Sequence, residues 1–486
     1  MSLTDVLAIW EKACEGAKVR WFLYRETLLC AEGYNRFPNE LDCVHTAILA
    51  QDLLKLVSEI LPNLPAEWHL NVQEMVMRHK PLSLECDGKA VMNIDVLWPV
   101  EGEEQAAMLR KTFKRIYIKP RKIVRNRKLL ALFCSSINVK GYGAAYKKAE
   151  RKAFEEVIAL SQTAAAEAGY YTDLLTKKHY QLLNQCRIDE AAVIVCDGKQ
   201  YPVFGEYRQY LKQSYGDYEE GLTDEIGVGL TAEEKEELKE HQKRCKEVLV
   251  FLQETAERFG LEYYLLAGSV LGAIREGGFI PWDDDIDVGV RVEKLEQFEA
   301  VVKEQLPLCL PAGFELVQSG ADNPYPRMFS KICYNGRCCA DLWPLIPTYQ
   351  EGLRAKFTWY FAKIITKAHY YKIGYKVTRF LKVVKPLCRV LSDKQVMALA
   401  RRNERKYVNR KTDAYINLYS VYKREKETIK REWLEQKAIV EFDGWKVPVV
   451  GCTDEYLRHL YGDYMTRPAA WKRASRHVER FYNKHN

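Results

Sequence analysis

The stretch GSVLGAIREGGFIPWDDDIDVGV, residues 268–290, decides the fold because it brings a cluster of carboxylates to the edge of a strand. Four of five consecutive positions are aspartates: Asp283, Asp284, Asp285 and Asp287. Two carboxylates about 4 Å apart repel by ~4 kcal/mol at an effective dielectric of 20, so this cluster needs a cation or full solvation. In a strand over 285–290, Asp285 and Asp287 share one face and the branched apolar residues share the other.

This pattern predicts a metal site on the edge of a packed sheet. Ligands that are all oxygen favour a hard cation, Mg²⁺ or Mn²⁺, which commonly bridges to a substrate phosphate. The small Gly268-Ser269 pair upstream suits a turn at a helix N-terminus. Such a turn lets backbone amides and the helix dipole approach a phosphate.

A third carboxylate is expected from Asp341, which lies between Ala340 and Leu342 in an apolar run. Burying a lone charge is costly, so this aspartate should have a partner. It would complete the metal site or accept the proton of the acceptor. The alternative is an Asx turn before Pro344.

Weaker assignments surround this set. Arg275 could neutralise a phosphate or be an ordinary exposed helix residue, and Trp282 could stack on a base or pack on the sheet edge. Asp284 is assigned with them to substrate binding. Lys331 flanks the Asp341 strand, and we expect it to be a solvated charge.

The order Gly272-Ala273-Ile274-Arg275, Gly278-Phe279-Ile280-Pro281-Trp282 and then the aspartates resembles the LicD family, which includes the fukutin-type enzymes. The resemblance implies a nucleotidyltransferase-type α/β fold. It also implies transfer of a phospho-alcohol, such as phosphocholine or ribitol phosphate, from a CDP-alcohol donor to a cell-surface glycan or its lipid-linked precursor. Asp285, Asp287 and Asp341 then take the catalytic and metal-binding roles.

The chain also contains two similar halves. DGKQYPVFGEYRQYLKQSYGDY at 197–218 resembles DGWKVPVVGCTDEYLRHLYGDY at 443–464, with an offset of 463 − 217 = 246. NIDVLWPV around Asp95 resembles CCADLWPL around Asp341, and 341 − 95 = 246. A period this long predicts a duplicated domain. We therefore expect two tandem nucleotidyltransferase-like domains, 1–228 and 229–486, each a small mixed sheet covered by helices.

The first repeat departs from the pattern. Glu26-Thr27 replaces Gly268-Ser269, and the loss of glycine should block close backbone approach to a phosphate. Glu40, Asp42 and Asp95 remain as a possible carboxylate set. We expect a degenerate domain retained for packing or acceptor binding.

Composition agrees with two globular domains and excludes other classes. Of the 486 residues, 47% are hydrophobic and 29% charged, which is typical of folded domains with real cores. No apolar run is long enough for a transmembrane helix. The N-terminus lacks a basic region, and the 14 cysteines lack framework spacing, so we expect a cytoplasmic protein with reduced thiols.

Two basic segments, 111–128 and 354–389, contain nine and ten Lys or Arg and no acid. The second is rich in aromatic residues and suits peripheral contact with an anionic membrane, at the inner face, or with a phosphorylated lipid. A solvated helix face is the alternative. Nucleic acid is the rival partner, but no recognised nucleic-acid module is visible.

Other functions for the aspartate cluster remain to be weighed. The same fold could transfer the nucleotide itself to a protein or a small molecule. A Ca²⁺-binding EF-hand fails because Val288 stands where glycine is needed and Lys294 where glutamate is needed. A glycosyltransferase of the Asp-x-Asp kind would not need the Gly-Ser turn or Asp341.

Overall fold

The computed structural model describes residues 1–72, 75, 81–117, 144–163, 170–173, 182–184, 188, 191–318, 328–372, 381–420 and 422–473. The chain divides into two compact units. Unit 1 comprises Met1–Leu230 with Ala469–Lys472, and unit 2 contains Thr231–Pro468. The expected second domain, 229–486, included residues 469–472, which the structure groups with unit 1 instead.

Unit 2 is built on a mixed sheet with the strand order β10-β11-β14-β13-β12. β11 and β14 are parallel, while β10–β11, β14–β13 and β13–β12 are antiparallel. Two further strands extend from the end of β14 in the order β14-β15-β16. The bounds are β10 Tyr264–Leu265, β11 Ile286–Arg291, β12 Phe314–Val317, β13 Ser330–Tyr334, β14 Arg337–Thr348, β15 Ala414–Ile416 and β16 Thr428–Lys430. The expected small mixed sheet is confirmed for this unit.

The long helix α11, Ala232–Phe259, packs across this sheet. Thr231 and Glu234 form a capping box at its start, and Gly260 ends it in the left-handed conformation at φ 63°. The Thr-x-x-Glu pattern at 231–234 and the glycine at 260 are the sequence signals from which these ends follow. Its buried side includes Leu238, Val248, Leu249 and Leu252, which the helical period also predicts.

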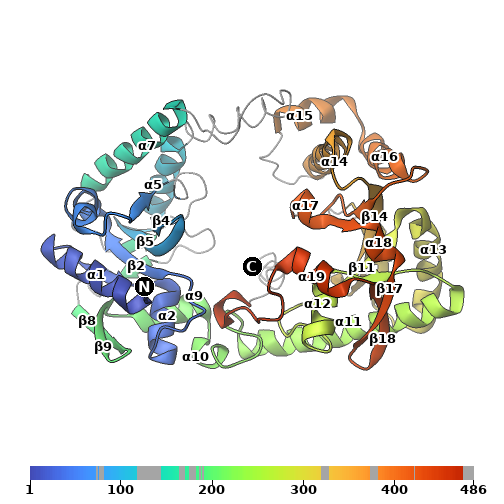
Figure 1. The fold of residues 1–486 in the computed structure, drawn as a ribbon, viewed down its shortest axis with the longest axis horizontal. Helices are drawn as coiled ribbons and strands as arrows, with labels where there is room; N and C mark the ends of the chain where they lie inside the picture. Colours follow the sequence, from blue (N-terminus) through green and yellow to red (C-terminus); the bar gives the residue numbers. More distant parts are fainter. Residues whose placement is uncertain are drawn as a thin grey trace. The chain divides into compact units, whose positions relative to one another are not determined.

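The remaining helices of unit 2 surround the sheet. A separate core forms where α14 packs against α15 and α16, at one end of the unit, and the β17–β18 hairpin lies at the other end (Figure 1). The bounds are α12 Ala267–Arg275, α13 Val292–Cys309, α14 Leu353–Lys372, α15 Leu381–Val390, α16 Asp393–Glu404, α17 Arg424–Glu427, α18 Arg431–Glu435, β17 Lys437–Phe442, β18 Trp445–Val450 and α19 Thr453–Tyr461.

Unit 1 has a second mixed sheet with the order β1-β2-β5-β4-β3, extended from β5 by β6 and β7. Again the two central strands, β2 and β5, are parallel and the others antiparallel. Unit 1 also has a separate antiparallel hairpin, β8–β9, which corresponds to the β17–β18 hairpin of unit 2. The strands are β1 Trp21–Leu23, β2 Val44–Leu49, β3 His69–Asn71, β4 Leu82–Cys86, β5 Lys89–Val100, β6 Tyr170–Asp173, β7 Leu182–Asn184, β8 Ala191–Cys196 and β9 Lys199–Phe204.

Helices cover the sheet of unit 1 as well. The N-terminal helix is α1, Leu3–Gly16, capped by Ser2 and Asp5. The other helices are α2 Arg25–Tyr34, α3 Leu53–Lys55, α5 Glu103–Ile116, α7 Ala144–Gln162, α9 Tyr207–Tyr215 and α10 Tyr218–Gly221. The expected fold class, an α/β chain with two small helix-covered mixed sheets, is confirmed.

The two basic segments are only partly described. Residues 118–128 of the first and 373–380 of the second lie outside the described residues. The described part of 354–389 belongs to α14 and α15. Among the described helices, none combines the length and the apolar character needed to cross a bilayer.

Candidate active site

Two neighbouring parallel strands hold the central carboxylates. β11 and β14 place Asp287 directly opposite Asp341. Ile286, Val288 and Val290 are fully buried, as the alternation of the strand predicts. Asp287 therefore lies on the opposite face of β11, and Asp285, directly before the strand, lies on the same side as Asp287.

A β-bulge brings a cysteine into this site. The register of β13 and β14 shifts between Ile332 and Cys333, and a bulge re-aims the side chains beside it. Cys338 Sγ lies 3.0 Å from Asp341 Oδ1. One ligand atom from each of Asp285, Cys338 and Asp341 lies within 4.8 Å of the others. From the sequence, Cys338 and Cys339 are expected to be small core residues of a strand rather than ligands.

The carboxylates repel one another strongly at Asp285. Burial raises the pKa of Asp285 well above its usual value, and the negative charges of Asp287, Asp341, Asp283 and Asp284 raise it further. Asp283, Asp284 and Asp285 also form a group in which one carboxylate oxygen of each lies within 4.8 Å of the others. A divalent cation at this point would relieve the repulsion.

Lys331 supplies positive charge from β13. Its ammonium donates to Asp341 Oδ1 and lies 3.2 Å from Cys338 Sγ. Burial opposes the charge on Lys331, but the charge and hydrogen bond of Asp341, together with Cys338 and Asp285, outweigh burial and raise the lysine pKa. The expectation of a solvated Lys331 is wrong, because this side chain is buried. It holds the carboxylate of Asp341 in place.

The Gly268-Ser269 pair lies in the first turn of α12, directly against the aspartates. Ser269 Oγ accepts a hydrogen bond of 2.8 Å from the backbone N–H of Asp287. A Cβ at Gly268 would lie 2.8 Å from Asp283 Oδ2 and 3.8 Å from Asp287 Oδ2. Glycine is therefore the residue that allows the helix N-terminus to approach the carboxylates so closely.

Trp343 is a further site residue that the sequence analysis missed. Its indole Nε1–H donates a 2.7 Å hydrogen bond to Asp287 Oδ1. Its ring packs against Phe329, with 3.8 Å between the ring centroids. The hydrogen bond from Trp343 orients the Asp287 carboxylate. Only the position of Trp343 two residues after Asp341 hinted at such a role.

The three weaker candidates are buried or half-buried. Arg275 is paired with Glu276 at 2.6 Å and donates to the backbone carbonyl of Tyr464 at 3.0 Å. Trp282 is half-buried against the core, and the Arg275 guanidinium lies 5.7 Å from its ring centroid. Asp284 is buried on the side facing α11, where its backbone carbonyl lies 3.7 Å from Cys245 Sγ.

A small pocket of about 90 Å³ opens beside Asp287. Glu427, at the end of α17, lines the same pocket and accepts a hydrogen bond from the Ser420 hydroxyl. The pKa of Glu427 is raised to about 7. Burial is the main cause, and the charge of Asp287 adds to it, while the hydrogen bond from Ser420 acts in the opposite direction. Nothing in the spacing of the sequence singles out this residue.

A larger, basic pocket of about 550 Å³ shares Ser420 and Tyr422 with the first. Lys363 of α14 donates to the carbonyl of Ser420 and lies 3.7 Å from the centroid of the Trp359 ring. Burial lowers the pKa of Lys363 to about 8. The other cationic residues of its lining are Lys356, Lys367, Lys423 and Arg424.

Unit 1 shows what replaces the carboxylates in its own sheet. The backbone N–H of His45 donates a 2.7 Å hydrogen bond to Thr27 Oγ1, just as that of Asp287 donates to Ser269 Oγ. The two pairs are related by the same sequence offset, since 287 − 45 equals 269 − 27. His45 pairs with Asn93 across the parallel strands, as Asp287 pairs with Asp341. The positions of the two aspartates are thus taken by a histidine and an asparagine.

The prediction that Asp42 and Asp95 occupy the positions of the unit 2 carboxylates is therefore wrong, because the strand pairing places other residues there. Asp95 pairs with Ala47, and its carboxylate is fully buried and held by Arg25 through bonds of 2.7 and 2.8 Å. The side chain of Asp42 is 78% exposed and bonds to Lys472 at 2.6 Å. The sequence offset misled because Trp98 lies three residues farther along β5 than Trp343 lies along β14, counted from the first residue of each strand.

Comparison with known proteins places this site in a family. Residues 260–377 match the family described as LicD/FKTN/FKRP, nucleotidyltransferase domain. The chain is 43% identical over 61 residues to the lipopolysaccharide cholinephosphotransferase LicD of Haemophilus influenzae, covering 13% of this chain and 23% of that protein. It is 30% identical over 103 residues to the ribitol 5-phosphate transferase FKRP of Mus musculus, covering 21% of this chain and 20% of that protein.

The extent of these matches is limited. The chain spans about a fifth to a quarter of the length of the curated relatives it matches. Among solved structures, the polyadenylate synthase of Megavirus aligns at 9% identity with a TM-score of 0.17, over 84% of this chain and 69% of that one, which carries no argument about the fold. The family match covers the Gly-Ser turn, the aspartate strand and Asp341. Residues 260–377 are thus the part of this chain that is similar to the LicD/FKTN/FKRP nucleotidyltransferase domain.

Proposed function

We propose that unit 2 transfers a phospho-alcohol from a CDP-linked donor to a glycan, and that the reaction depends on Mg²⁺ or Mn²⁺. Asp285, Asp287 and Asp341 would hold the cation. The relatives support the reaction class, since one is named a cholinephosphotransferase and the other a ribitol 5-phosphate transferase.

One observation carries the metal dependence. Asp285 is surrounded by four other carboxylates, and its pKa is raised by burial and by their charges. Lys331 supplies one compensating charge, on Asp341. The oxygen-rich donor set fits a hard divalent cation, which would neutralise developing charge on the transferred phosphate.

The surrounding residues give the rest of the reaction its geometry. The N-terminus of α12 at Gly268-Ser269 offers backbone amides to a phosphate of the donor. Trp343 and Ser269 fix the carboxylate and the backbone of Asp287. Glu427 has a pKa near neutrality in the same pocket, which suits a general base that takes the proton of the acceptor hydroxyl.

We assign the acceptor to the basic pocket. It adjoins the Asp287 pocket through Ser420 and Tyr422, and its lysines suit an acceptor that carries phosphate. The exposed aromatic residues Phe357 and Tyr360 of α14 support peripheral contact with an anionic membrane or a lipid-linked precursor. Lys363 is not part of such a surface, because its ammonium is bonded to Ser420.

We further propose that unit 1 is a degenerate copy of unit 2. The two sheets share one strand order and one parallel central pair. His45 and Asn93 stand where the metal carboxylates would be, and Arg25 supplies a permanent cation to Asp95. A degenerate site of this kind suits packing or acceptor binding rather than turnover.

The test is incubation of the full chain with a panel of CDP-alcohols and Mg²⁺, with and without glycan acceptors. Release of CMP that depends on both the metal and an acceptor is expected. Release of pyrophosphate from CTP with labelling of a protein or small molecule would instead assign transfer of the nucleotide. No product from any CDP-alcohol with a full acceptor panel would overturn the proposed donor.

A further inference from the structure

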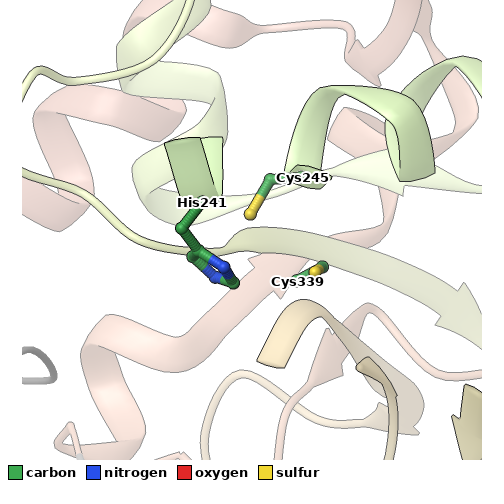
Figure 2. Close-up of side chains that lie close together, drawn as sticks. All are labelled: His241, Cys245 and Cys339. Carbon is green, nitrogen blue, oxygen red and sulfur yellow. The ribbon is translucent and has the colours of Figure 1, made fainter. Parts of the chain in front are cut away.

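A second cluster of potential metal ligands lies between α11 and β14, on the side of β14 away from Asp341. His241, Cys245 and Cys339 each offer one ligand atom, and these atoms all lie within 4.8 Å of one another. The three side chains converge from the helix and the strand (Figure 2). None of the three is more than 5% exposed.

The fold explains why these side chains meet. His241 and Cys245 are four residues apart on α11, so they share one face of the helix. The bulge in β13–β14 places Cys338 beside Asp341, while Cys339 packs with Cys245 in the apolar core. Adjacent cysteines thereby serve two different sites.

His241 makes one hydrogen bond that is typical of a metal-ligating histidine. Its Nε2 lies 2.8 Å from the carbonyl oxygen of Cys338. A ligating histidine usually donates one ring N–H to a carbonyl or carboxylate, which orients the other nitrogen toward the metal. Burial, and then the charge of Arg337, lower the pKa of His241 to about 4, so the imidazole is neutral at pH 7. Neutral imidazole is the form that binds metal.

We propose that His241, Cys245 and Cys339 bind a Zn²⁺ ion. Two sulfurs and one imidazole nitrogen are soft ligands that select zinc over the hard cation expected at Asp285. Binding converts both thiols to thiolates and releases two protons to solvent. Three protein ligands leave one position of a tetrahedral site open, beside the loop of Asp284, whose backbone carbonyl lies 3.7 Å from Cys245 Sγ.

The zinc ion has a positioning role and makes no contact with the donor or the acceptor. It joins α11 to β14 immediately beside the bulge that presents Cys338 and Asp341. α11 also holds the aspartate loop through Gln242, whose amide donates 2.8 Å to the carbonyl of Asp283. Zinc at this point would lock the loop and the strand that carry the reaction's carboxylates.

The experiment measures metal content and cobalt spectra of the full chain. Protein purified with zinc in the medium and washed in Mg²⁺ buffer should retain about one zinc per chain by mass spectrometry. Co²⁺ added to metal-stripped protein should give a thiolate-to-cobalt charge-transfer band. Cys245→Ala with Cys339→Ala should abolish both signals. Cys30→Ala, an equally buried cysteine of unit 1, should leave them unchanged.

Two outcomes would overturn the proposal. Wild-type protein that binds no zinc and shows no charge-transfer band with Co²⁺ leaves the cluster as ordinary core thiols. Zinc that survives the double cysteine change but is lost in Asp285→Asn belongs to the carboxylate site. The wild-type spectra keep the test decisive even if the variants fold poorly, and neither readout depends on the proposed transferase activity.

Discussion

At the scale of single residues, the site combines groups that the sequence reveals with groups that only the fold brings in. Asp285, Asp287 and Asp341 could be singled out because four aspartates in five positions and a charge within an apolar run are unusual. Lys331, Trp343 and Glu427 could not, because their importance comes from partners 10, 56 and more than a hundred residues away in the chain. Long-range pairing of this kind leaves no local signal.

Asp287→Asn should lower turnover by at least ~10²-fold, because it removes the charge that would hold the metal and stabilise the transition state. The fold should persist, since the amide oxygen of asparagine can still accept from Trp343. CMP release and thermal unfolding measure the two effects. Glu455→Gln, an exposed change on α19, is the control. Full activity in Asp287→Asn would exclude this aspartate from the reaction.

Glu427→Gln should lower turnover by ~10²–10⁴-fold and change the pH profile, because a general base acts only when ionised. Wild-type turnover should rise as pH passes about 7, the raised pKa of Glu427. The groups acting on this carboxyl are Ser420, Asp287 and Lys363. The rise near pH 7 should vanish in the variant and persist in the exposed control Glu432→Gln.

Ionisation of Glu427, which should raise turnover, should lower the stability of the fold. The folded pKa of Glu427 lies above its ordinary value of 4.5, so its contribution is fully present below pH 4.5 and is lost as pH rises through about 7. Each pKa unit corresponds to ~1.4 kcal/mol. Denaturant unfolding should therefore show Glu427→Gln more stable than wild type at pH 8, with the difference vanishing at pH 4. An unchanged difference across this range would contradict the raised pKa.

At the scale of elements, the sequence predicts best where local signals are complete. α11 begins at the capping box and ends at Gly260 as expected, and β11 follows its alternation of aspartate and branched residues. The bulge at Ile332 and Cys333 could not be foreseen, because it arises in the pairing of two strands. It nevertheless decides which of Cys338 and Cys339 faces the carboxylates.

Two glycines of α12 should respond differently to alanine. A Cβ at Gly268 would meet the carboxylate of Asp283, which can rotate away, so activity should fall ~10-fold or more with little loss of stability. A Cβ at Gly272 would lie 2.4 Å from the backbone carbonyl of Gly278, which cannot move freely, so Gly272→Ala should cost ~1–3 kcal/mol.

Unfolding in urea and CMP release separate these two outcomes. Gly16→Ala is the matched control, since its Cβ would meet nothing within 4 Å. Equal loss of stability in Gly268→Ala and Gly272→Ala would show that both glycines serve packing alone.

At the scale of the whole molecule, the similarity of the two halves is visible in the sequence, but its register is not. The offset of 246 residues locates matching segments, and both sheets have the same strand order. The offset also pointed to Asp42 and Asp95 as residual carboxylates, whereas the strand pairing selects His45 and Asn93. A shift of two or three residues changes which side chains lie opposite one another on paired strands, so the pairing must be known before a site can be transferred from one half to the other.

Asp95→Asn with Asp42→Asn should leave turnover within about twofold of wild type, because neither aspartate occupies a position equivalent to Asp287 or Asp341. The pair should still lower stability. Asp95 is fully buried, and its loss leaves Arg25 with a weaker partner, which costs ~1–3 kcal/mol. Asp42→Asn alone, an exposed change, should be nearly neutral. CMP release at saturating donor and unfolding in urea measure both quantities. A loss of turnover as severe as that of Asp287→Asn, in protein that remains folded, would show that unit 1 takes part in the chemistry.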